Sequence, residues 1–144
     1  MATTTATISV SSDITSTATT INKTMTMTKA GTSNGLDETL GLRTKQFTST
    51  TAAEIATLGD LTNDRAHKLY VRNTSSSREY FFYVAYNASA AGATTQETIG
   101  KLYGGDWMIM PYNGSTDINV ASSTTEPQTL EWMVFADGIV EAAG

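Results

Sequence analysis

Apolar residues alternate with threonine and other polar residues along much of this chain. Over residues 6–14 the apolar side chains occupy even positions, whereas over residues 21–27 they occupy odd positions. A period of two is typical of a strand with one buried face. We therefore predict two N-terminal strands, with a turn or a bulge at Asn22-Lys23 carrying the change of phase.

Further segments of strand character are separated by turn residues. They are residues 41–51, 67–73, 79–86, 99–103, 106–110, 118–121 and 129–136, while residues 52–58 form either one helical turn or a loop. In segment 67–73 we expect Leu69 and Val71 to point inward. Gly104-Gly105 predicts a hairpin whose returning strand stops at Pro111. About eight to ten short strands at regular spacing indicate an all-β fold, an antiparallel β-sandwich of jelly-roll type.

Three of these segments are apolar on both faces of the predicted strand, namely 80–86, 107–110 and 130–135. A sandwich core covers one face only. The other face is covered either by the chain's own loops and N-terminal segment or by a neighbouring subunit. Both tryptophans lie in mid-strand among apolar neighbours, so we expect Trp107 and Trp132 to be buried.

Aromatic residues and methionine suit a subunit interface, and basic residues suit docking on an acidic protein. The basic stretch is either such a docking site or an ordinary solvated strand face. The candidate interface residues are Tyr80, Phe82, Tyr83, Tyr86, Met108, Met110, Met133 and Phe135, with the basic residues Arg65, Lys68, Arg72 and Arg78.

The composition is that of a structural subunit. Threonine accounts for 27 of the 144 residues, and only 16% of residues are charged. Threonine fits a pleated sheet surface, and a surface poor in charge is typical of a protein that other subunits cover. The length favours one β domain over residues 1–144, with residues 1–28 a Thr-rich strand region that contacts neighbouring subunits.

Charge and targeting signals exclude several classes of partner. The net charge of −5 disfavours nucleic acid, because an acidic surface repels phosphate backbones. The first residues lack the basic and apolar regions of a signal peptide, and no apolar run approaches the length of a membrane span. We therefore expect a product of the cytoplasm with no membrane partner.

No motif of catalytic or metal chemistry accompanies the strands. Cysteine is absent, and the single histidine, His67, has no nucleophile motif beside it. Asp60, Asn63 and Asp64 offer oxygen ligands, but their spacing matches no EF-hand loop. We predict a protein that is not an enzyme and that uses no cofactor or metal.

Residues 99–112 read IGKLYGGDWMIMPY, and are followed by DINV at 117–120 and LEWMVF at 130–135. This succession resembles small virion structural proteins of tailed phages, especially marine and cyanobacterial phages. In those proteins a G-x-L-x-x-G-D-W-x-x-x-P strand pair precedes a short polar strand and a C-terminal strand. The resemblance covers most of residues 66–136 and implies a non-enzymatic virion component.

The leading interpretation is a capsid decoration (cement) protein, made in the host cytoplasm and placed on the outer capsid surface. Its expected partners are the major capsid protein and further copies of itself in a homotrimer. A tail, neck or fibre-associated component is the alternative within the virion. A carbohydrate-binding module that uses exposed aromatics such as Tyr70, Tyr103, Trp107 and Tyr112 is the alternative from another class.

Overall fold

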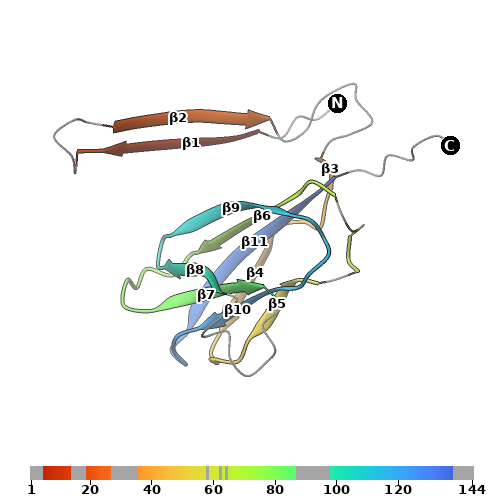
Figure 1. The fold of residues 1–144 in the computed structure, drawn as a ribbon. Helices are drawn as coiled ribbons and strands as arrows, with labels where there is room; N and C mark the ends of the chain where they lie inside the picture. The colour runs from red at the N-terminus through yellow and green to blue at the C-terminus, as the bar shows by residue number, and fades with distance from the viewer. Residues whose placement is uncertain are drawn as a thin grey trace.

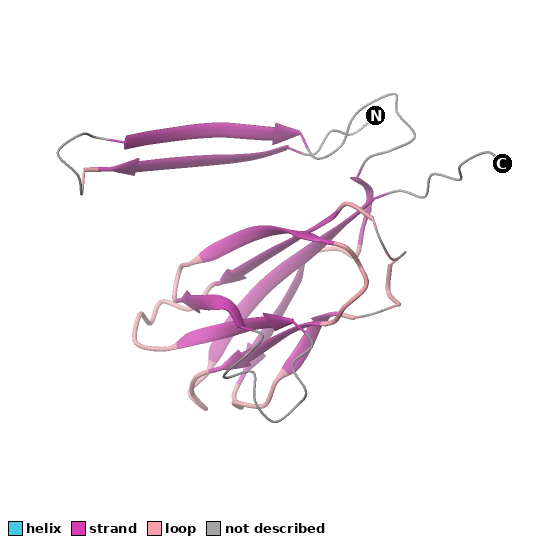
Figure 2. Cartoon of the chain, in the orientation of Figure 1, coloured by secondary structure: helices cyan, strands magenta, loops and turns pink. Residues whose placement is uncertain are grey.

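A computed structural model describes residues 5–13, 19–26, 36–57, 59–61, 63, 65–86 and 98–137 of the chain. These residues form eleven strands and no helix (Figures 1 and 2). The strands are β1 Thr5–Ser12, β2 Thr19–Thr26, β3 Leu36–Thr39, β4 Arg43–Phe47, β5 Ala53–Ala56, β6 His67–Asn73, β7 Phe81–Tyr86, β8 Thr98–Tyr103, β9 Trp107–Tyr112, β10 Ile118–Ser122 and β11 Gln128–Asp137. In this part of the chain no helix is long and apolar enough to cross a membrane.

Nine of the strands form a sandwich of two antiparallel sheets. The four-stranded sheet has the order β5-β10-β7-β8, and the five-stranded sheet has the order β3-β11-β6-β9, with β4 also paired to β11. Strands β4 to β11 follow the jelly-roll order, in which every connection except that from β7 to β8 passes between the sheets. The predicted antiparallel sandwich is confirmed, and the described part of the chain has eleven strands in all, one more than the upper end of the predicted eight to ten.

The core lies between the two sheets and is built from alternate residues of each strand. In β6, Leu69 and Val71 are fully buried while Arg72 is exposed, as predicted. Phe47 of β4 meets Phe82 of β7 edge to face, with ring centroids 5.3 Å apart, so one aromatic pair joins the two sheets. The other large buried side chains include Ile55, Val84, Leu102, Met110, Tyr112, Ile118, Val120, Leu130, Trp132 and Val134.

Strands β1 and β2 form a separate two-stranded sheet outside the sandwich (Figure 1). Their register pairs Ala6 with Met25 and Val10 with Ile21, so even positions of β1 share a face with odd positions of β2. The switch of apolar residues from even positions in β1 to odd positions in β2 therefore places them on one face of the hairpin. The predicted turn or bulge at Asn22-Lys23 is wrong, because both residues lie inside β2.

Two other local predictions are corrected by the strand pairing. Residues 53–56, within the segment expected to be a helical turn or a loop, form β5, which pairs with β10 at the edge of the four-stranded sheet. Pro111 does not end its strand, since β9 continues to Tyr112. Pro111 is tolerated there because β9 is an edge strand, and one side of its backbone needs no partner in the sheet.

The Gly104-Gly105 turn exists, but the strands on either side of it do not pair with each other. Strand β8 pairs with β7 in one sheet, whereas β9 pairs with β6 in the other. The predicted hairpin is thus a tight turn that carries the chain from sheet to sheet, with Gly105 at a φ of 88° that favours glycine.

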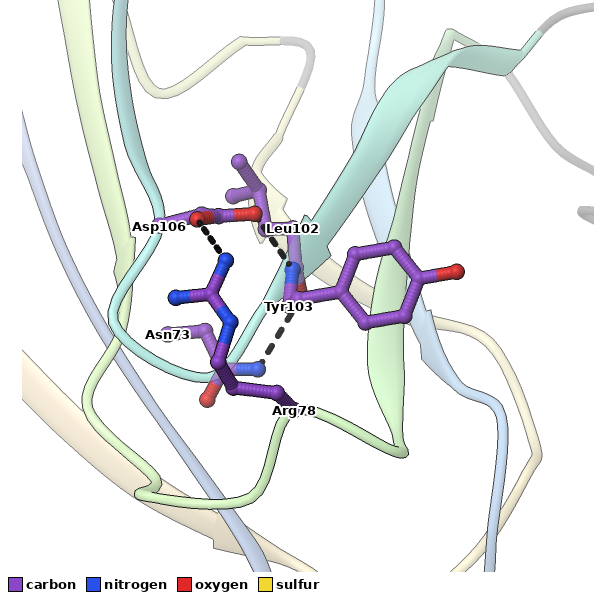
Figure 3. Close-up of polar contacts among 5 residues, drawn as sticks. All are labelled: Asn73, Arg78, Leu102, Tyr103 and Asp106. Atoms are coloured by element: carbon purple, nitrogen blue, oxygen red, sulfur yellow. Dashed lines mark hydrogen bonds and ion pairs between the residues drawn. The ribbon is translucent and has the colours of Figure 1, made fainter.

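A buried asparagine fixes this turn. The side chain of Asn73 donates to the Leu102 carbonyl at 3.0 Å, and its backbone carbonyl accepts a hydrogen bond from Gly105 N at 2.9 Å. Asp106 accepts from Tyr103 N at 3.0 Å and lies 3.7 Å from the Arg78 guanidinium (Figure 3). These contacts join the end of β6 in the five-stranded sheet to the end of β8 in the four-stranded sheet.

Close approach of the backbone at this turn predicts a large effect of one methyl group. A Cβ at Gly104 would overlap the carbonyl oxygens of Ser75 and Ser77, whereas a Cβ at Gly100 meets nothing within 4 Å. We expect Gly104→Ala to lower the free energy of unfolding by about 2–3 kcal/mol, the range for a steric overlap in a packed site. Gly100→Ala, the matched control, should leave it unchanged or slightly higher. Equal urea midpoints for the two variants would contradict this account of the turn.

Candidate interaction surface on the five-stranded sheet

The outward side chains of β9, β6 and β11 form three rows across the five-stranded sheet. Antiparallel register places directly opposed residues on the same face. We define these three rows together with Leu42 as the outer face. The rows are Trp107–Arg72–Glu131, Ile109–Tyr70–Met133 and Pro111–Lys68–Phe135.

Most of the outer face is apolar, and part of it is open to solvent. Trp107 is 50% exposed and Leu42 is 60% exposed, while Ile109, Met133 and Phe135 are half-buried. Contiguous exposed apolar surface of this kind marks interaction sites on proteins. The outer face is therefore the strongest candidate for a functional surface in the described part of the chain.

The exposure of Trp107 corrects the expectation that both tryptophans are buried. Met108 and Met110 point toward the core, and Trp107 pairs with Arg72 on the opposite face. Trp132 is buried, with 7% of its surface exposed, as expected. Strand β9 is apolar on both of its faces, so its own sequence does not show which face is buried. Its pairing with β6 decides this.

The polar groups of the outer face are joined across the strands. The Tyr70 hydroxyl donates a hydrogen bond to Oε1 of Glu131 at 2.9 Å, and Arg72 lies opposite Glu131 in the register. Burial, followed by the hydrogen bond and charge of Glu131, raises the pKa of Tyr70. The hydroxyl therefore stays protonated at neutral pH, and it holds the Glu131 carboxylate at the surface of the sheet.

The N-terminal hairpin borders this face without filling it. A gap of about 340 Å³ separates residues 5–8 at the start of β1 from Trp107, Ile109, Tyr70 and their neighbours. Further along the hairpin, Val10 and Ile21 are each 45% exposed. The hairpin and the sheet thus present two apolar surfaces, each of which is partly open to solvent.

The predicted interface residues fall on three different parts of the fold. Phe82 and Met110 are buried in the core and Met108 packs against it, so these three are core residues and not surface residues. Tyr80, Tyr83 and Tyr86 lie in or beside β7 of the four-stranded sheet. Met133 and Phe135 are the two predicted residues of this apolar set that lie on the outer face.

The basic stretch is not brought together as one patch. Lys68 and Arg72 lie on the outer face, whereas Arg65 precedes β6 and Arg78 follows its other end. Arg78 is paired with Asp106, and the ammonium of Lys68 donates to the carbonyls of Ala66 and His67 at 2.8 and 3.3 Å. Arg65 and Lys68 line the same hollow beside His67 and Tyr112, whereas Arg72 and Arg78 lie outside it, so the four cations do not form one continuous patch.

Other residues considered for chemistry have structural positions. His67 is buried at the start of β6, with its ring centroid 6.2 Å from that of Tyr112. Tyr112 is itself buried, which removes it from any exposed aromatic platform. The described residues hold no group of three or more acidic, histidine or cysteine side chains that could bind a metal. Asp64, one of the candidate oxygen ligands, lies outside them.

Sequence reasoning missed Leu42 and Ile109 as surface residues. Leu42 immediately precedes β4, where no alternation of polar and apolar residues marks its orientation. Ile109, like Trp107, lies in a strand that is apolar on both faces, so the sequence does not show which face is exposed. The signal that could have located the outer face is the clear alternation of segment 67–73. Its polar residues mark the outward side of β6, and pairing with β6 then shows which residues of β9 and β11 lie on the same side.

Comparisons of this chain with protein-family models, with curated proteins and with solved structures find no match.

The two tryptophans should differ sharply in their contribution to stability. We expect Trp132→Ala to lower the free energy of unfolding by roughly 3–5 kcal/mol, because it empties a core site. Trp107→Ala should cost only about 1–2 kcal/mol in the dissociated chain, since half of that side chain is already exposed. Urea unfolding at low protein concentration measures both values. Similar losses for the two variants would contradict the orientation of β9.

Two tyrosines predict an alkaline loss of stability. Burial raises the pKa of Tyr70 and of Tyr112, with Asp117 and Asp60 adding to the effect at Tyr112. When the pKa of a tyrosine is higher in the folded state than in the unfolded state, the neutral side chain stabilises the fold. This stabilisation is complete below the pKa of the unfolded chain, about 10, and is lost as the pH rises through the pKa of the folded state. The unfolding free energy should therefore fall more steeply above pH ~10 in the parent than in a Tyr70→Phe/Tyr112→Phe variant. Parallel pH profiles in urea titrations would argue against both shifts.

Proposed function

We propose that this protein is a non-enzymatic structural component of a phage virion, a decoration protein that binds the outer capsid surface and associates with copies of itself. The observation that carries the proposal is the pair of open apolar surfaces, the outer face of the five-stranded sheet and the apolar face of the β1-β2 hairpin. A compact sandwich whose core is already closed has no internal use for them. Coverage by neighbouring subunits accounts for both.

Three other features support the proposal. The succession of residues 99–112, 117–120 and 130–135 resembles small virion proteins of tailed phages. The jelly-roll order of β4 to β11 occurs in viral capsid domains, although it also occurs in lectins, so this support is by analogy of fold. The net charge of −5 suits a surface that faces away from the packaged DNA.

Attachment of such a protein stabilises the shell by mass action. A protein that binds the assembled shell more tightly than the dissociated subunits shifts the equilibrium toward the shell. Each copy contributes a small free energy, and many copies act together across seams that open cooperatively. An apolar outer face is adequate for this role without any catalytic group.

Copy number in purified particles tests the assignment and separates its variants. Quantitative mass spectrometry of intact particles should find this protein in hundreds of copies, comparable with the major capsid protein. A handful to some dozens of copies would instead assign it to the tail, neck or a fibre. Its absence from purified particles would reject a virion role altogether.

The apolar character of the outer face predicts salt-resistant attachment. At about 1 M salt the Debye length is roughly 3 Å, so exposed ion pairs are screened while apolar contacts persist. We expect particles washed in about 1 M salt to retain the protein. Quantitative release by salt alone would favour electrostatic docking through Arg65, Lys68, Arg72 and Arg78.

A carbohydrate-binding module is the second candidate, and the exposure of Trp107 favours it. A half-exposed indole beside the Arg72 and Glu131 side chains offers a ring for stacking and polar groups for sugar hydroxyls. Glycan-array binding by the isolated protein that is lost in Trp107→Ala would support this candidate. Binding of no glycan would leave the outer face to protein contacts.

A further inference from the structure

We propose that the β1-β2 hairpin is an exchanged arm, whose apolar face packs on the outer face of a second copy of this chain. The inference rests on the self-association part of the proposed function and names the two surfaces that meet. The apolar side chains on one face of the arm are Ala6, Ile8, Val10, Ile21 and Met25, and Lys23 lies among them, with Ser12 and Thr19 at the end of the same face.

The arm needs a covering surface to be stable. Its other face carries only threonine, serine and asparagine at the paired positions, and Thr7 and Thr24 are joined there by a hydroxyl–hydroxyl contact of 2.8 Å. On the apolar face Ile8 and Met25 remain 39% and 41% exposed. A two-stranded hairpin is marginally stable in water, and a hydrophobic face packed on another layer is what stabilises it.

The arm's own sandwich leaves this requirement unmet. Within the chain, residues 5–8 border the 340 Å³ gap and do not close it. In the view of Figure 1 the far end of the hairpin extends beyond the sandwich. Val10 and Ile21 lie toward that end, where they are open to another molecule.

The two surfaces match in their apolar character, and one pair of opposite charges can join them. The outer face also carries Lys68 and Arg72, so Glu131 is the group on it that Lys23 can approach. Lys23 is the one charged side chain on the arm's apolar face, and Glu131 is the one carboxylate among the described side chains of the outer face. Packing that brings Lys23 to Glu131 with β2 antiparallel to β11 would place Ile21 near Met133, the next residue after Glu131 on the same face of β11.

A second copy is the occupant because every chain carries both halves of the contact. The arm and the outer face are different surfaces, so the contact is heterologous and closes into a ring when its rotation allows. Nine residues separate β2 from β3 in the sequence, and nine residues span at most about 30 Å when extended. That reach is sufficient for an arm to cross to a neighbouring sandwich.

Cross-linking between two differently tagged variants tests the exchange, and the absence of native cysteine makes it specific. One variant carries Ile21→Cys and the other Met133→Cys. Packed sheets lie about 10 Å apart, so a short bismaleimide is a better linker than a direct disulfide. We expect a product that contains both tags. Thr24→Cys, on the opposite face of the same strand, is the matched control and should give at least severalfold less product with Met133→Cys.

A charge exchange tests the register in the same system. Lys23→Glu should weaken self-association by roughly two- to fivefold, the range for a partly exposed ion pair, and Glu131→Lys in the same chain should restore it. Circular dichroism confirms that each variant is folded before its association is measured by light scattering.

Two results would overturn the exchange. One is efficient cross-linking of Ile21→Cys to Met133→Cys within one doubly substituted chain at high dilution, with no product between chains at high concentration, because the arm would then cover its own sheet. The other is normal self-association with equal product from Ile21→Cys and Thr24→Cys. Either outcome leaves the virion assignment standing, since copy number in particles is measured independently, and an exchanged arm would equally survive a failure of that assignment.

Discussion

A strand divides its side chains between two faces, and a sandwich of two sheets buries only one face of each. This constraint governs the molecule. The core between the sheets is closed by residues such as Leu69, Phe82 and Trp132, yet the five-stranded sheet is apolar on its outer side as well. The N-terminal hairpin repeats the situation, with one face of threonine and one of isoleucine, valine and methionine. Two apolar surfaces in one chain, each partly open to solvent, are the basis of the contact between chains that we propose.

Sequence alone was sufficient where the polar–apolar alternation is unambiguous. In segment 67–73 the strongly apolar residues fall on alternate positions, so the sequence predicts which of its side chains are buried. The regular spacing of short strands likewise predicts the sandwich. In β9, by contrast, Trp107 and Ile109 on one parity are as apolar as Met108 and Met110 on the other. Long-range pairing with β6 decides between them, and no local pattern contains that information. The same reason placed Phe82 and Met110 among the interface candidates although both belong to the core.

Turn signals were informative about position and not about partners. Gly104-Gly105 marks a real turn, but the strands beside it enter different sheets. Buried Asn73 and the Ser77 carbonyl, which accepts a hydrogen bond from Gly104 N, hold the turn across the end of the sandwich. Likewise the change of phase near Asn22 reflects a register between strands and not a local irregularity. The candidate surface was therefore only partly predictable. Met133 and Phe135 were expected, whereas Trp107 and Ile109 emerge from the strand pairing and Leu42 from its place beside them at the gap under the hairpin.

The most direct test of the central claim is the solvent exposure of Trp107 in the dissociated and the assembled protein. A Trp132→Phe variant leaves Trp107 as the one indole of the chain, so its fluorescence reports on the outer face alone. If neighbouring subunits cover this face, quenching by iodide should be strong at high dilution and should fall severalfold on assembly, with the emission shifted to shorter wavelength. Equal quenching in the two states would show that the outer face stays open, and would contradict the role assigned to it.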